Sequence, residues 1–215
     1  MSAEAQVQVT RAPAGEIIAT GVSEEEYLEK YAAHFCEWVD GDVIKMSPVR
    51  ERHDMITRFL AILFEVYFEL KPMGRIRQAP FVMSNPITGR SREPDLQVIL
   101  NTNPGDLTET RMIGVADICI EVVAPESVER DHGDKFAEYE KGGVPEYWIM
   151  DPLRDECRFY RLDDGGRYLR QTEDSEGSYR TLTLPGLVLH VPTLWGDALP
   201  GPIAIGEAVQ KMLRE

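Results

Sequence analysis

Two acidic side chains lie inside segments whose other residues are typical of core β-strands. In A-D-I-C-I-E-V-V, alternation places Glu121 on the same strand face as Cys119 and Val123, among apolar neighbours. An unpaired charge is costly there, so Glu121 must be protonated, paired with a cation or bound to a metal. In E-P-D-L-Q-V-I-L, the same alternation places Asp95 and Gln97 on one face.

If these two strands are neighbours, Asp95 and Glu121 converge on one side of a sheet. Two carboxylates without clustered histidines or thiols suit a hard ion such as Mg²⁺ or Mn²⁺. Such an ion activates water and neutralises the charge of a phosphodiester. In the structural alternative, Glu121 pairs with a buried Arg or Lys, and Asp95 only begins a strand.

The N-terminal half contains three elements that could position these acids. Ser23 and Glu26 form a capping box at the start of a helix. Two alternating runs on either side of Asp40-Gly41 predict a β-hairpin. The apolar stretch over about residues 53–70 predicts a mostly buried helix.

A strand, a helix and a strand are predicted around Glu121. Strands are also expected at about 75–83 and 94–100, followed by a mobile loop over 101–113. The apolar A-D-I-C-I-E-V-V is typical of a central strand, and D-H-G-D-K-F-A-E-Y-E-K-G-G predicts a short helix with Asp131 as its cap. With P-E-Y-W-I-M-D-P as the next strand, these elements predict a right-handed βαβ crossover with parallel strands.

The remaining pattern divides the chain into one main domain with two extensions. E-C-R-F-Y-R-L and R-Y-L-R-Q-T predict a second hairpin, followed by a strand near 182–191 and a helix near 205–213. We expect a flexible arm over 1–21, a domain over 22–197 and a helical tail over 198–215.

The composition is that of a globular protein, with 43% hydrophobic and 28% charged residues in a chain of 215. Cys36, Cys119 and Cys157 are far apart, which predicts reduced thiols rather than disulfides or a zinc site. No apolar run is long enough to cross a membrane, and the first residues do not resemble a secretory signal. We therefore expect a cytoplasmic protein without a membrane partner.

The charge distribution bears on a nucleic-acid partner. The net charge of −14 argues against one, because phosphate contacts need clustered Lys and Arg. Residues 50–92, however, carry 8 basic and 4 acidic side chains, a local net of +4. This segment makes Arg75, Arg77 and His53 candidate DNA contacts. A solvated surface and a structural histidine are the alternatives.

Several longer stretches resemble a known family. P-D-L-Q-V-I-L, I-E-V-V-A-P-E-S, R-D-H-G-D-K-F-A-E-Y-E-K-G-G-V-P-E-Y-W-I-M-D-P and F-C-E-W-V-D-G-D-V-I-K-M-S-P are similar to the Uma-type restriction endonuclease family. This family is a branch of the PD-(D/E)XK nuclease superfamily, and the resemblance covers about residues 22–194. It implies an α/β fold with a restriction-endonuclease-like αβββαβ core, a mixed central sheet flanked by helices, and additional β-hairpins. It also implies Mg²⁺-dependent (or Mn²⁺-dependent) hydrolysis of DNA.

The resemblance also assigns roles to single residues. Asp95 matches the Asp of the family's P-D, and Glu121 matches the acid of (D/E)-x-K, which makes both the expected metal ligands. Val123 occupies the place of the usual lysine, so the resemblance implies that Lys135 on the following helix replaces it. Glu37 matches an acid of the first hairpin and could join the outer shell of the metal. The alternatives are an exposed strand residue at Glu37 and an exposed helical residue at Lys135. If Lys135 is the replacement lysine, we expect Lys135→Ala to leave metal binding and folding nearly intact and to slow cleavage.

Three functions are compatible with the sequence. The first is a metal-dependent DNA endonuclease. The second is a non-catalytic module that binds DNA or protein, which Val123 and the charge of −14 favour. The third is an enzyme acting on RNA or another phosphate ester. Cutting both strands of a duplex would favour a homodimer.

Overall fold

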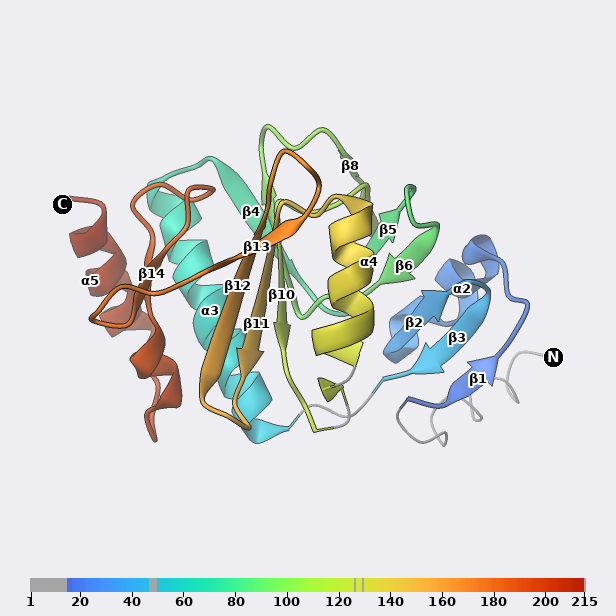
Figure 1. Ribbon diagram of the computed structural model, residues 1–215, viewed down its shortest axis with the longest axis horizontal. Helices are drawn as coiled ribbons and strands as arrows, with labels where there is room; N and C mark the ends of the chain where they lie inside the picture. The colour runs from blue at the N-terminus through green and yellow to red at the C-terminus, as the bar shows by residue number, and fades with distance from the viewer. Residues whose placement is uncertain (1–14, 47–49, 126, 129, 215) are drawn as a thin grey trace.

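Two large mixed β-sheets and their helices make up the fold in the computed structural model, which describes residues 15–46, 50–125, 127–128 and 130–214 (Figure 1). One sheet consists, in spatial order, of β1 (Ile17–Ala19), β3 (Asp42–Lys45), β2 (Cys36–Val39), β6 (Arg90–Arg92), β5 (Val82–Asn85), β9 (Arg111–Ile113) and β8 (Asp106–Leu107). The other consists of β13 (Tyr168–Gln171), β12 (Glu156–Leu162), β11 (Glu146–Asp151), β10 (Ile118–Val122), β7 (Leu96–Leu100) and β4 (Gly74–Gln78).

The strand that carries Glu121 lies in the middle of the second sheet. It pairs in parallel with β11 and antiparallel with β7. Helix α4 (Lys135–Gly142) connects β10 to β11 and ends at Gly143, whose φ of 81° suits glycine. The predicted strand, helix and parallel strand are therefore confirmed.

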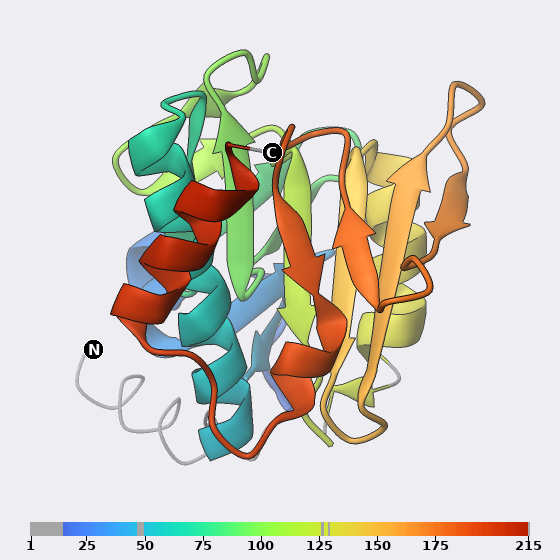
Figure 2. The same ribbon diagram turned by 90° about the vertical axis from the view of Figure 1, so that its left-hand side faces the viewer.

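Helices cover both faces of this sheet. On one face, α3 (Glu51–Leu70) packs through residues such as Phe64, and α5 (Pro202–Met212) lies alongside it (Figure 2). The segment with β14 (Ser178–Arg180) and β15 (Val188–His190) covers the same face. Helix α4 covers the other face through Tyr139. The apolar sequence of β10 follows from this double coverage.

The N-terminal elements follow their predicted patterns. Helix α2 (Glu24–Lys30) begins after Ser23, whose Oγ accepts a 3.2 Å hydrogen bond from the Glu26 backbone N–H. Strands β2 and β3 form the hairpin around Asp40 and Gly41, which both have a positive φ, as a tight two-residue turn requires. The described part of the chain also contains two short 3₁₀ helices, Ala32–His34 and Val191–Trp195.

The strand predicted over 75–83 is wrong as a single element. The chain turns after β4, where Phe81 N–H donates a 3.0 Å hydrogen bond to the Gln78 carbonyl. Pro80, which has no N–H, cannot continue the ladder. The next strand, β5, joins the other sheet, so the stretch 75–83 connects the two sheets.

Three further predictions need correction. The expected loop over 101–113 contains β8 and β9, and Met112 of β9 is buried. The strand near 182–191 is shorter than predicted, because only Val188–His190 pairs with a neighbour. Asp131 does not cap α4 but lies in a π-helical turn, Arg130–Asp134, that leads into it.

None of the helices in the described part of the chain is both long and apolar enough to cross a membrane.

Candidate metal-binding site

Asp95 and Glu121 meet where β10 ends. The antiparallel register places Cys119 opposite Gln97 and Ile120 opposite Leu96, so Asp95 follows in the position level with Glu121. Both carboxylates line one small cavity of about 50 Å³. The structure therefore brings the two predicted metal ligands together.

Asp95 is held through one of its two oxygens. Its Oδ2 accepts a 2.7 Å hydrogen bond from the Val122 backbone N–H and lies 3.0 Å from His53 Nε2 on α3. Burial lowers the pKa of His53, but the hydrogen bond and the charge of Asp95 outweigh burial and leave that pKa raised. Asp95 Oδ1 has no hydrogen-bond partner among the described residues.

Glu121 is buried and is also held through one oxygen. Its Oε1 accepts hydrogen bonds of 2.9 Å from Lys135 Nζ and from the Tyr139 hydroxyl. Burial raises the pKa of Glu121, the charge of Lys135 lowers it and the charge of Asp95 raises it, so that this pKa lies above its usual value in the metal-free protein. Among the described residues, Oε2 has no hydrogen-bond partner.

Lys135 lies inside the protein at the start of α4, with only 1% of its surface exposed. Its Nζ is 2.9 Å from Glu121, 3.0 Å from Glu37 and 3.6 Å from Asp131. Burial lowers the pKa of Lys135, but the three carboxylates raise it above its usual value, so the amine is charged. The alternative of an exposed helical residue is therefore wrong. The burial of Lys135 also bears on Lys135→Ala, which would leave buried carboxylates uncompensated, so we now expect that variant to lose stability.

Glu37 is fully buried, which overturns the alternative of an exposed strand residue. Its carboxylate binds Lys135 and accepts a 2.8 Å hydrogen bond from Arg92 Nη1. Burial raises the pKa of Glu37, but Lys135 and Arg92 lower it to about 2. Glu37 does not line the cavity and reaches Glu121 through Lys135.

The sequence interpretation missed two buried charges that support Lys135. Asp131 lies one helical turn before Lys135 and accepts a hydrogen bond from Ser127. Arg92 donates to Glu37 and to both oxygens of Glu138. The spacing of Asp131 and Lys135 by four residues was a usable signal. Arg92 had been counted with the basic segment 50–92, and its burial removes it from any DNA-facing surface.

The predicted substrate contacts Arg75 and Arg77 lie on the edge strand β4, outside the cavity. Arg77 pairs with Gln97, so its side chain leaves the same sheet face as Asp95. It donates to the Ile76 carbonyl and lies 5.4 Å from the centre of the Phe81 ring. Arg75 is exposed, whereas His53 contacts the site directly through Asp95.

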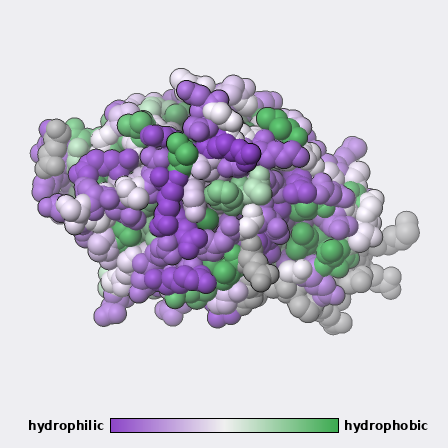
Figure 3. Space-filling model, viewed as in Figure 1, coloured by the Kyte–Doolittle hydropathy of each residue, from purple (hydrophilic) through white to green (hydrophobic). Residues whose placement is uncertain are grey.

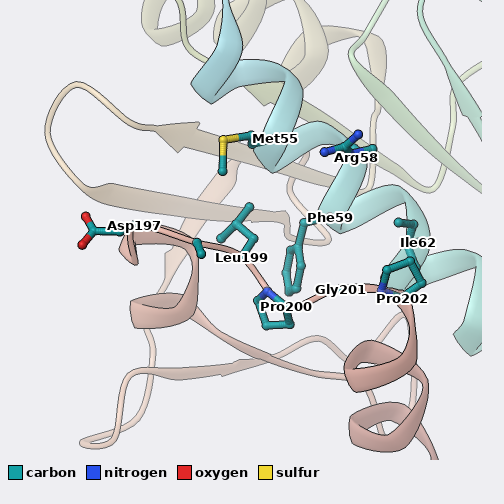
Figure 4. Close-up of a pocket in the computed structure, with 10 residues that line it drawn as sticks. Met55, Arg58, Phe59, Ile62, Asp197, Leu199, Pro200, Gly201 and Pro202 are labelled. Atoms are coloured by element: carbon teal, nitrogen blue, oxygen red, sulfur yellow. The ribbon is translucent and has the colours of Figure 1, made fainter.

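A larger hollow of about 450 Å³ lies on the other side of α3 (Figure 4). It separates α3 from the segment 197–202, and its walls are mainly apolar, with Phe59 and Leu199 among them. Asp197 is its one lining carboxylate, so this hollow lacks the paired acids of the small cavity.

The donor set of the small cavity fits a hard divalent cation. Asp95 Oδ1 and Glu121 Oε2 are carboxylate oxygens without hydrogen-bond partners among the described residues, and both side chains line the cavity. The described residues include no cluster of three or more His, Cys, Asp or Glu side chains that could hold a metal ion. An ion bound by two carboxylates would therefore keep several water or substrate oxygens, as Mg²⁺ commonly does.

Comparisons with known proteins identify the family and the fold. Residues 24–192 match the model of the Uma2 family, described as "Putative restriction endonuclease". The fold is similar to the crystal structure of a "putative nuclease belonging to DUF820" from Anabaena variabilis, with a TM-score of 0.64 and 15% sequence identity. That match covers 78% of this chain and 96% of the other, and it confirms the predicted fold class. A search of curated proteins found no match.

Proposed function

The chain belongs to the Uma2 family, and from that premise we propose that it is a metal-dependent endonuclease that hydrolyses phosphodiester bonds of DNA. The observation that carries the proposal is the convergence of Asp95, Glu121 and Lys135 at one cavity. Two carboxylates with unpartnered oxygens beside a fixed ammonium group are better suited to a site that hydrolyses phosphodiester bonds than to a purely structural ion-pair cluster.

In this proposal, Asp95 and Glu121 hold Mg²⁺ or Mn²⁺ through Oδ1 and Oε2. When bound, such an ion neutralises phosphate charge and lowers the pKa of a water molecule. The protein contributes the orientation of both ligands. The Val122 amide and His53 fix Asp95, while Lys135 and Tyr139 fix Glu121.

Lys135 supplies the fixed positive charge that the family signature places at residue 123. A preorganised cation stabilises the negative charge that develops on a reacting phosphate, and it does so most strongly where water is excluded. Glu37 and Asp131 hold the ammonium group, so it need not reorganise during the reaction. Arg75, Arg77 and His53 are proposed contacts to the substrate on the α3 and β4 side.

Plasmid cleavage tests the proposal. Supercoiled DNA is incubated with the protein in Mg²⁺, Mn²⁺ or EDTA, beside Asp95→Asn, which preserves the shape of the side chain. We expect nicked or linear DNA with the metals only, and none with the variant. Intact plasmid together with cleaved RNA or cleaved small phosphodiesters would support a different phosphoesterase. If every substrate stays intact, the non-catalytic binding module is favoured.

A further inference from the structure

A second hollow adjoins the candidate metal-binding site. It has a volume of about 450 Å³ and lies between the β2–β3 hairpin and α4. Figure 1 shows these elements beside each other, and Figure 3 shows that the same side of the molecule is largely hydrophilic. Arg130 lines both this groove and the metal cavity, so the two spaces are neighbours. Val39 and Ile44 form the apolar wall of the groove.

Two of the cations that line the groove are already neutralised. Arg90 pairs with Asp40 at 2.5 Å and with Glu138 at 3.1 Å. Arg92 pairs with Glu37 and Glu138. These ion pairs join the hairpin sheet to α4 and leave little charge for a ligand.

Two other cations retain unused donors. Arg130 Nε is buried without a hydrogen-bond partner among the described residues, and its nearest carboxylate, Glu37, is 4.0 Å away. A buried N–H group without an acceptor calls for a ligand or a water molecule. Lys141 is exposed at the opposite end of the groove and makes no ion pair within the described parts of the chain.

Two acidic residues line the groove, and one of them, Glu138, is neutralised by Arg90 and Arg92. Asp134 lines the groove, is exposed and also has no ion-pair partner among the described residues. It precedes Lys141 by seven residues, about two helical turns, so both lie on the same side of the helix. A bound anion would be attracted by Lys141 and repelled by Asp134.

We propose that this groove binds the phosphodiester backbone of the substrate on one side of the scissile bond. Arg130 contacts the phosphate next to the metal cavity, and Lys141 contacts a phosphate farther along the strand. Val39 and Ile44 face the sugars. The proposal rests on the proposed nuclease function and adds a path for the DNA that the metal ligands do not define.

Binding of a labelled DNA duplex over a series of salt concentrations tests the groove. The Asp95→Asn protein serves as the common background, so that the DNA stays uncut. Adding Lys141→Gln or Arg130→Gln should weaken binding at low salt by about 3-fold or more, and each should reduce the slope of log affinity against log salt by roughly 0.9. Asp134→Asn should strengthen binding, because it removes a repelling charge. Arg170→Gln is the control, since Arg170 is an exposed cation on β13 that pairs with Glu156.

The outcomes separate this proposal from the nuclease itself. Each variant is first compared with the background protein by circular dichroism and thermal melting. If DNA binds but none of the three groove variants changes affinity or slope relative to Arg170→Gln, the groove is not the path and the nuclease proposal stands. A protein that neither binds nor cuts DNA would overturn both.

Discussion

The buried ammonium group of Lys135 has two electrostatic roles. It balances the charges of Glu37, Glu121 and Asp131, and it places a cation beside the cavity that Asp95 lines. The long stem of lysine allows a residue on α4 to reach a site built mainly on strands. The charge that Val123 cannot provide is thus supplied from the other side of the site.

Replacing Lys135 with methionine should separate these roles. Methionine keeps much of the volume but removes the cation beside Glu121 and Asp131, while Glu37 keeps its ion pair with Arg92. The free energy of unfolding should therefore fall by about 3–5 kcal/mol in the metal-free protein. Added Mn²⁺ should recover part of that loss, because removing the ammonium group leaves a more negative site. Cleavage, measured below the melting temperature, should slow by roughly 10²-fold or more. A variant that is as stable as the original and cuts at the original rate would contradict both roles.

At this scale, alternation along each strand predicted the faces of Asp95 and Glu121, and the pairing of β7 with β10 brings the two side chains together. The burial of Glu37 could not be predicted in the same way. Its strand, C-E-W-V, has the same pattern whether the acid faces solvent or faces Lys135 of a distant helix. Arg92 was misjudged for the same reason: its two acidic partners are 46 and 55 residues away.

At the scale of elements, an alternating chain of charges joins the first hairpin to α4. It runs from Asp40 through Arg90, Glu138 and Arg92 to Glu37, which contacts Lys135. The outer end of this chain is exposed to solvent, whereas Arg92 and Glu37 are buried. The inner ion pairs should therefore be far more sensitive to the loss of one partner than the outer ones.

Two matched substitutions test whether the buried ion pairs are more sensitive to the loss of a partner than the exposed ones. Arg92→Met should lower the free energy of unfolding by about 3–5 kcal/mol, because Glu37 and Glu138 lose a buried partner. Arg90→Met should cost no more than about 1 kcal/mol, because Arg90 is 31% exposed and solvent screens its ion pairs. Urea denaturation of both variants measures the difference. Equal losses of unfolding free energy in the two variants would show that burial does not determine how much these ion pairs stabilise the protein.

The elements themselves were predictable where the pattern was local. The capping box of α2, the Asp-Gly hairpin, the buried helix α3 and the crossover from β10 to β11 all follow from short-range signals. The break between β4 and β5 was missed although Pro80 marks it. Ile76, before Pro80, packs into the core on the α3 side of the six-stranded sheet, whereas Phe81 and Met83 pack into the core on its α4 side. Strand β9 was missed because its parallel partner β5 lies far away in the sequence.

At the scale of the whole molecule, an acidic protein is proposed to bind a polyanion. Its net charge is −14, so any DNA contact must come from a local concentration of cations. Arg75 and Arg77 on the edge strand β4 provide one such surface, on the sheet face that also carries Asp95. Neither arginine takes part in an ion pair among the described residues, although Arg77 donates to the Ile76 carbonyl and lies over the Phe81 ring.

Charge reversal of this pair tests the surface. Arg75→Glu combined with Arg77→Glu should weaken DNA binding at low salt. It should also reduce the slope of log affinity against log salt by the amount expected for about two phosphate contacts. The fold should be retained, because β4 is an edge strand and Arg75 is exposed. Fluorescence anisotropy gives the affinity at each salt concentration. Unchanged affinity at low salt would remove the β4 surface from the binding face.

The position of a bound metal is the most direct test of the site. A crystal soaked in Mn²⁺ should show one anomalous peak between Asp95 Oδ1 and Glu121 Oε2, at about 2.1 Å from each, with Lys135 still beside Glu121. A crystal of Asp95→Asn soaked in parallel should show no peak there. Strong Mn²⁺ binding elsewhere, with an empty cavity in the unaltered protein, would contradict the assignment of these two carboxylates as the metal ligands.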